Sequence, residues 1–145
     1  MKKRLSCLAL AALVAAPSLV SAQALSIRQQ FTLPVAQIDA DRFEVIEADG
    51  AGNTQMWCAA GIYVRKVLGQ RGGDIFVETA RGPSVTTPGR KAVVFTTKPL
   101  DGAFSPFHRG VGRAGATHSM AHAYALCAET RFLRIRTGPN TLVRW

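Results

Sequence analysis

A short segment of this chain holds the residues best suited to chemistry, namely its three histidines together with neighbouring arginines. His118 and His122 stand four residues apart, which places both imidazoles on one face of a helix. Two imidazoles can hold zinc or copper, but zinc needs three or four ligands, and His108 is the remaining candidate. Residues 119–121 are Ser-Met-Ala, so the glutamate of a metalloprotease motif is absent. A small histidine-dependent hydrolase or metal-binding enzyme using His108, His118 and His122 is therefore an alternative interpretation, and no metal or cofactor is predicted.

The same segment contains the pattern Gly-x-Gly-x-x-Gly at residues 110–115. In dinucleotide-binding folds this pattern follows a strand directly and opens a helix, and an acidic residue comes about 20 positions later. Here the pattern lies far from the preceding expected strand and lacks that acidic residue, which argues against dinucleotide binding. A glycine-rich loop before a helix still exposes backbone amides at the positive end of the helix dipole. The sequence therefore predicts a small anion-binding site formed by Arg109, Arg113, Thr117 and His118.

Residues 1–22 have the pattern of a secretory signal peptide, with a basic start, an apolar stretch from Leu5 to Val20 and small residues after it. The apolar stretch is shorter than the ~20 residues of a spanning helix, so we expect cleavage and no membrane span. Cleavage removes three basic residues from a chain whose formal net charge is +9, and the mature chain stays basic. A basic chain favours anionic partners, and export argues against nucleic acid as one of them.

Cys58 and Cys127 remain after cleavage, because Cys7 lies within the signal peptide. An even pair of cysteines in an exported chain normally forms a disulfide, since oxidising compartments make and keep such bonds. We therefore predict a Cys58–Cys127 disulfide. Closing a loop of this length stabilises a fold by about 4 kcal/mol in the chain-entropy model.

Hydrophobic periodicity predicts elements in the order β-α-β-β-α-β. The expected strands are 42–48, 74–78, 91–97 and 132–137, and the expected helices are 54–68 and 117–129. This order matches an α+β, ferredoxin-like split βαβ sheet with two antiparallel helices on one face, cross-linked by the disulfide. The chain then divides into a signal peptide at 1–22, an N-terminal extension at 23–41 and a single α+β domain at 42–145.

Strand alternation also assigns side chains to the sheet face away from the helices. The residues expected there are Arg42, Glu44, Phe76, Phe132, Arg134 and Arg136. Glu44 is expected to pair across strands with Arg134 or Arg136. Aromatic and basic side chains on an open sheet are typical of single-stranded RNA binders, but the aromatic motifs of those proteins are missing here.

Three runs of sequence are similar to those of a known group of proteins. Phe43-Glu44-Val45-Ile46-Glu47, Trp57-Cys58-Ala59-Ala60-Gly61 and Ala125-Leu126-Cys127 resemble small exported proteobacterial proteins of uncharacterised function. The resemblance implies an exported two-cysteine α+β domain and transfers no catalytic residue. From the export signal and the basic charge we predict a periplasmic or secreted, non-enzymatic basic domain that binds an anionic glycan, a lipid head group or a protein partner in the cell envelope through basic loops.

Overall fold

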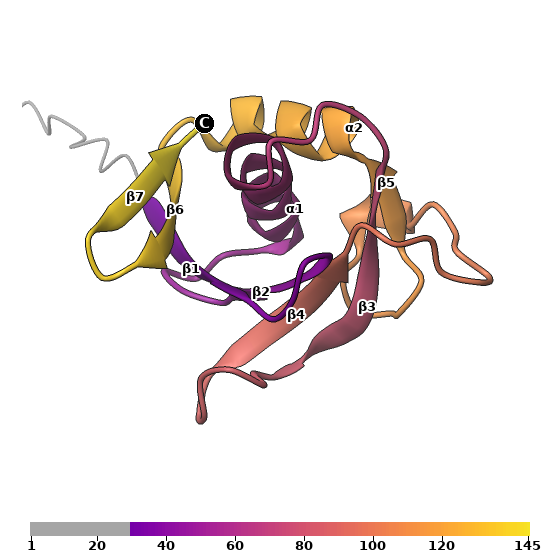
Figure 1. Ribbon diagram of the computed structural model, residues 1–145, viewed down its shortest axis with the longest axis horizontal. Coiled ribbons are helices and arrows are strands. Elements are labelled where there is room, and N and C mark those ends of the chain that lie inside the picture. Colours follow the sequence, from indigo (N-terminus) through magenta and orange to yellow (C-terminus); the bar gives the residue numbers. More distant parts are fainter. Residues whose placement is uncertain (1–29) are drawn as a thin grey trace, which may run out of the picture.

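The computed structural model describes residues 30–145, so the predicted signal peptide lies outside the described part of the chain. These residues form a seven-stranded sheet that curves around two helices (Figure 1). The strands are β1 (Phe31–Gln37), β2 (Arg42–Ile46), β3 (Asp74–Pro83), β4 (Lys91–Thr96), β5 (Thr117–Ser119), β6 (Leu133–Gly138) and β7 (Thr141–Arg144). The helices are α1 (Asn53–Ile62), which continues as a π-helical turn at Tyr63–Val67, and α2 (Met120–Ala125), which continues as a 3-10 turn at Leu126–Thr130. The predicted α+β class is confirmed, and none of the helices in residues 30–145 is long and apolar enough to cross a membrane.

The strand order is β5-β3-β4-β2-β1-β6-β7, which differs from the predicted four-stranded ferredoxin-like sheet. In that prediction the strand at 42–48 lies directly beside the strand at 132–137. In the structure β1 separates β2 from β6, pairing antiparallel with β2 and parallel with β6. Phe31–Gln37, expected in an N-terminal extension, is thus a central strand, with Leu33 and Val35 buried in the core. Pro34 hides this strand from sequence analysis, because proline is rare in central strands.

The predicted disulfide is present and lies at the contact between the two helical segments. Cys58 of α1 and Cys127 are both fully buried, and their Cα atoms are 4.9 Å apart. The helices approach closely beside it, because a Cβ atom on Gly61 would lie 2.6 Å from the backbone nitrogen of Tyr124. A glycine at this position therefore permits the contact that brings the two cysteines together.

The second helix begins later than the sequence predicts. Thr117–Ser119, expected as its first turn, form the edge strand β5 against β3, and α2 begins at Met120. The Ser119 hydroxyl accepts a hydrogen bond from the His122 amide and so caps the helix at this later point. The predicted helix at 117–129 is therefore wrong in its first turn.

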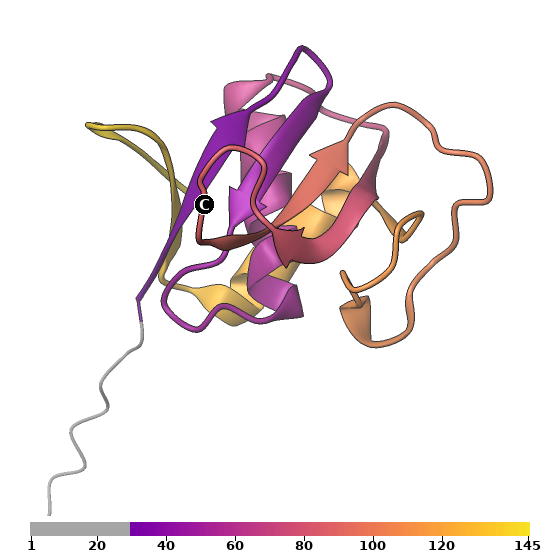
Figure 2. The same ribbon diagram turned by 90° about the horizontal axis from the view of Figure 1, so that it is seen from below.

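The sheet face away from the helices is partly covered by the connection between β3 and β4 (Figure 2). Glu44 of β2 lies beneath this connection and is fully buried. Its carboxylate accepts hydrogen bonds from Ser84, Val85 and Thr86. The expected cross-strand pairing of Glu44 with Arg134 or Arg136 is therefore wrong, and those arginines receive no charge compensation from it.

Candidate functional site

The histidines of the sequence-predicted site lie around one hollow of about 450 Å³ on the β5 side of the molecule. Its lining residues are Thr54, Pro106, His108, Arg109, His118 and His122. The rings of His118 and His122 are in contact, with centroids 4.6 Å apart, although they come from β5 and α2 and not from one helix. Within residues 30–145, no group of three histidine, cysteine or acidic side chains is arranged to hold a metal ion.

The surroundings of His118 shift the pKa of its side chain. Its ring packs edge-on against Trp57 with centroids 4.6 Å apart, and its Nε2 atom is buried without a hydrogen-bond partner among the described residues. Burial, together with smaller effects of the nearby His122 and Arg109, lowers the pKa of His118 from 6.5 to about 4. The imidazole is therefore neutral at physiological pH.

Arg109 holds the loop between β4 and β5 against α1 and the end of the second helical segment. Its guanidinium donates two hydrogen bonds to the Glu129 carboxylate, at 2.6 and 2.8 Å, and one to the Thr54 hydroxyl at 3.2 Å. Its carbonyl accepts from the Trp57 indole at 3.0 Å. These contacts hold His108 and Arg109 at positive φ, of 51° and 57°, a region that costs free energy for residues other than glycine. Arg109 is therefore already paired with a carboxylate.

The other members of the predicted anion site also have partners within the fold. The Arg113 guanidinium lies over the Phe104 ring at 4.8 Å, and Arg113 is not among the residues lining the histidine hollow. The Thr117 amide donates to the Phe104 carbonyl, and its hydroxyl donates to the Ile75 carbonyl. Because Thr117 belongs to a strand, its amide does not point outward from a helix start. The structure brings Arg109 and His118 to one hollow and Thr117 and His118 to a second one, and Arg113 lines neither. The anion site stays a prediction.

A second concentration of charge lies on the β6–β7 hairpin. Arg134 of β6 is directly opposite Arg144 of β7, and Arg136 is opposite Leu142. Residues opposite each other in an antiparallel pair share one face of the sheet, and like charges in this arrangement repel. Residues 130–145 contain no aspartate or glutamate, so no acidic side chain of the hairpin itself compensates these charges. Arg134 donates instead to neutral groups, the Thr32 hydroxyl at 2.9 Å and the Gln30 amide oxygen at 3.3 Å.

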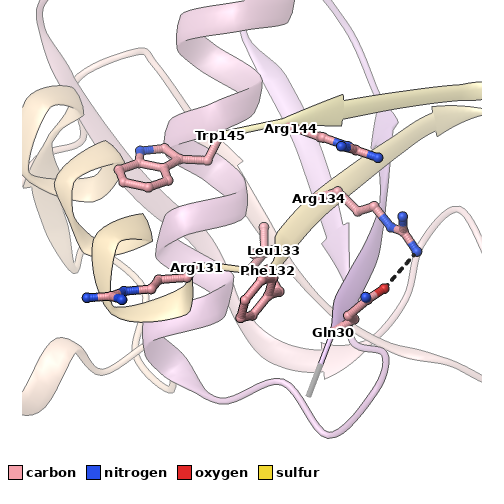
Figure 3. A pocket seen from close by; sticks show the side chains of 7 residues that line it. All are labelled: Gln30, Arg131, Phe132, Leu133, Arg134, Arg144 and Trp145. Carbon is pink, nitrogen blue, oxygen red and sulfur yellow. Dashed lines mark hydrogen bonds between the residues drawn. The ribbon is translucent and has the colours of Figure 1, made fainter. Parts of the chain in front are cut away.

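Arg134 and Arg144 border a pocket of about 200 Å³ at the end of the hairpin (Figure 3). Its lining residues are Gln30, Arg131, Phe132, Leu133, Arg134, Arg144 and Trp145. Arg134 and Arg144 extend to the same side, whereas Arg131 extends away from them on the other side of Phe132. The pocket therefore combines three cationic side chains with two aromatic rings. We call it the hairpin pocket.

Sequence analysis placed Phe132, Arg134 and Arg136 on an exposed face and did not recognise the pocket. The signal that was present is compositional, since four arginines and no acidic residue follow Glu129. Sequence analysis did not predict strand β7, whose pairing with β6 sets Arg144 against Arg134 and brings Trp145 to the pocket.

No family model, curated protein or solved structure matches this chain. The resemblance to small exported proteobacterial proteins therefore stays a prediction. Function must be argued from the two sites themselves, the histidine hollow and the hairpin pocket.

Proposed function

We propose that this protein is an exported, non-enzymatic basic domain, periplasmic or secreted, that binds an anionic component of the cell envelope through the β6–β7 hairpin. The observation that carries the proposal is the direct opposition of Arg134 and Arg144 in a segment without acidic residues. An anion bound between or beside them would remove the repulsion that this arrangement creates in the free protein.

The chemistry of the hairpin pocket suits carboxylate, phosphate and sulfate groups. Arginine presents a planar fork of donors that matches such groups in a bidentate way and keeps its charge at all physiological pH values. The two neutral hydrogen-bond partners of Arg134 orient its guanidinium without neutralising it. A pre-oriented cation loses less conformational entropy on binding than a free one.

The proposal is tested with a polyanion that has no ring, inorganic polyphosphate. The test variant is Arg134→Gln/Arg144→Gln, and the control is Arg71→Gln/Lys91→Gln, which removes the same charge from exposed positions elsewhere. We expect the test variant to bind about tenfold more weakly or worse, equivalent to about 1.4 kcal/mol, while the control stays close to the parent. Binding should also weaken with added salt, because exposed charges are screened over about 8 Å at physiological ionic strength. Equal losses of affinity in the two variants would show that binding depends on net charge alone. That result would contradict a site on the hairpin.

A second candidate function is a small histidine-dependent hydrolase or metal-binding enzyme. The observation in its favour is that His108, His118 and His122 line one hollow, in which the Nε2 atom of His118 has no partner among the described residues. Calorimetric titration with Zn²⁺ and Cu²⁺ tests it. One ion bound per chain, with binding lost in His118→Ala and kept in the hairpin double variant, would support this function over the first.

A further inference from the structure

We infer that the ligand of the hairpin pocket is an acidic polysaccharide, whose sugar rings pack on aromatic side chains while its carboxylates pair with the arginines. This inference rests on the proposed function and specifies its ligand class. It depends on how aromatic and cationic side chains alternate at this end of the molecule.

The aromatic part of the surface continues from the hairpin pocket onto α2. The ring of Trp145 lies 6.3 Å from that of Tyr124, centroid to centroid. The guanidinium of Arg65 lies 4.4 Å from the centre of the Tyr124 ring, and the Lys66 ammonium lies 6.0 Å from it. Trp145 extends to the same side as Arg131 (Figure 3), so it connects this side of the pocket to a second pair of cations over Tyr124. This alternation of rings and charges forms a track longer than the pocket.

A track of this kind fits a chain of anionic units better than a single ion. The pocket volume of about 200 Å³ is below the ~300–1,000 Å³ typical of sites that enclose a whole small molecule. It can take one ring-sized unit, and neighbouring units would pass over Arg131 on one side and Arg134 and Arg144 on the other. In a polyuronate each unit carries one carboxylate, so rings and charges alternate in the ligand as they do on the protein.

The exposure of the rings favours a sugar over a membrane surface. Trp145 is 46% exposed and Phe132 is 38% exposed, and both line a hollow. The C–H faces of a sugar ring can pack on such partly recessed rings, because the aromatic face is electron-rich. Docking into lipid instead requires side chains that project. Among the large hydrophobic side chains of residues 30–145, Phe107 is the most exposed, at 93%, and it lies in the β4–β5 loop and not at this pocket.

The test compares a ring-containing polyanion with a ring-free one. Oligogalacturonate is the acidic polysaccharide, inorganic polyphosphate is the ring-free polyanion, and dextran is the neutral polysaccharide. The test variant is Trp145→Ala, Trp145→Phe restores an aromatic ring, and Phe107→Ala is a control that removes an exposed ring elsewhere. Thermal unfolding of each variant shows that the fold is retained.

We expect Trp145→Ala to bind oligogalacturonate about three- to tenfold more weakly and polyphosphate as the parent does. Trp145→Phe and Phe107→Ala should bind both polyanions like the parent, and dextran should not bind. Equal weakening of both polyanions by Trp145→Ala would overturn the inference. So would tighter parental binding to polyphosphate, to phosphatidylglycerol vesicles or to a thymidine oligonucleotide. If polyphosphate binds through Arg134 and Arg144 and oligogalacturonate does not, this inference fails and the proposed function stands. If neither polyanion binds, both fail.

Discussion

Replacing Glu44 with glutamine should destabilise the fold more than any other single change of a carboxylate to an amide in the described chain. Glu44 is 0% exposed, and it lies on β2, between β4 and β1. One carboxylate oxygen accepts from the Val85 amide at 2.7 Å. The other accepts from the Ser84 hydroxyl at 2.8 Å, from the Thr86 amide at 3.1 Å and from the Thr86 hydroxyl. All the partners of this buried charge are therefore hydrogen-bond donors.

The size of the effect follows from these contacts. A glutamine amide presents one oxygen and one NH₂ group, so at least one of the donors would face another donor in a buried place. Leaving a buried donor without an acceptor costs about 1–3 kcal/mol, and the remaining bonds lose the strength that the charge adds. We therefore expect Glu44→Gln to lower the free energy of unfolding by about 3 kcal/mol. In a domain of this size that corresponds to a fall in melting temperature of roughly 10–15 °C.

The pH dependence provides an independent check on the same contacts. Burial raises the pKa of Glu44, but the hydrogen bonds from Thr86, Val85 and Ser84 outweigh it and hold the pKa below its ordinary value of 4.5. A carboxyl whose pKa is lower in the folded state contributes stability above its unfolded pKa and loses it as pH falls through the folded value. The stability difference between parent and Glu44→Gln should thus be constant near neutral pH and shrink below about pH 4.5.

Urea unfolding followed by tryptophan fluorescence measures both effects. Glu78→Gln is the matched control, because Glu78 pairs with Arg42 at a partly exposed position, and such pairs contribute about 0–1 kcal/mol. If the free energy of unfolding of Glu44→Gln lies within about 0.5 kcal/mol of the parent value, the hydrogen bonds that hold the β3–β4 connection on the sheet contribute little to stability. The reasoning above would then be refuted.

Three further predictions concern the core and the histidine hollow. Cys58→Ala/Cys127→Ala should lower the free energy of unfolding by about 4 kcal/mol in the chain-entropy model, and denaturant unfolding of the oxidised parent beside this variant measures the loss. Gly61→Ala should destabilise by about 1–3 kcal/mol, because its Cβ would meet the Tyr124 backbone at 2.6 Å; a melting temperature equal to that of the parent would show that the helices move apart without cost. His118 should stay neutral down to pH 5, since its pKa is lowered to about 4, whereas the unfolded chain protonates near 6.5. Stability should accordingly decline as pH falls from about 6.5 to about 4, and an imidazole NMR titration with a midpoint above 6 would contradict the burial of His118.

Local patterns were sufficient for the elements whose apolar residues recur with a clear strand or helix period. Phe43 and Val45 alternate with polar residues and lie in β2, and the apolar run around Trp57 forms α1. The first turn predicted for the second helix was wrong, because Thr117 and His118 pair with Phe76 and Ile75 of β3, and this strand pairing overrides local helix preference. β1 was missed for a similar reason, since the interactions that outweigh the effect of Pro34 come from β2 and β6, which are distant in sequence.

By itself the sequence determined the α+β class, the basic character of the chain and the pairing of Cys58 with Cys127, because periodicity, charge and cysteine count are properties of composition and spacing. Only the tertiary structure decided which charges are compensated. Arg109 and Glu129 are 20 residues apart in sequence and form an ion pair, whereas Arg134 lies opposite Arg144 and donates to the neutral groups of Thr32 and Gln30. Whether an arginine is available to a ligand depends on which side chains surround it in space, and strand pairing between distant segments sets those neighbours.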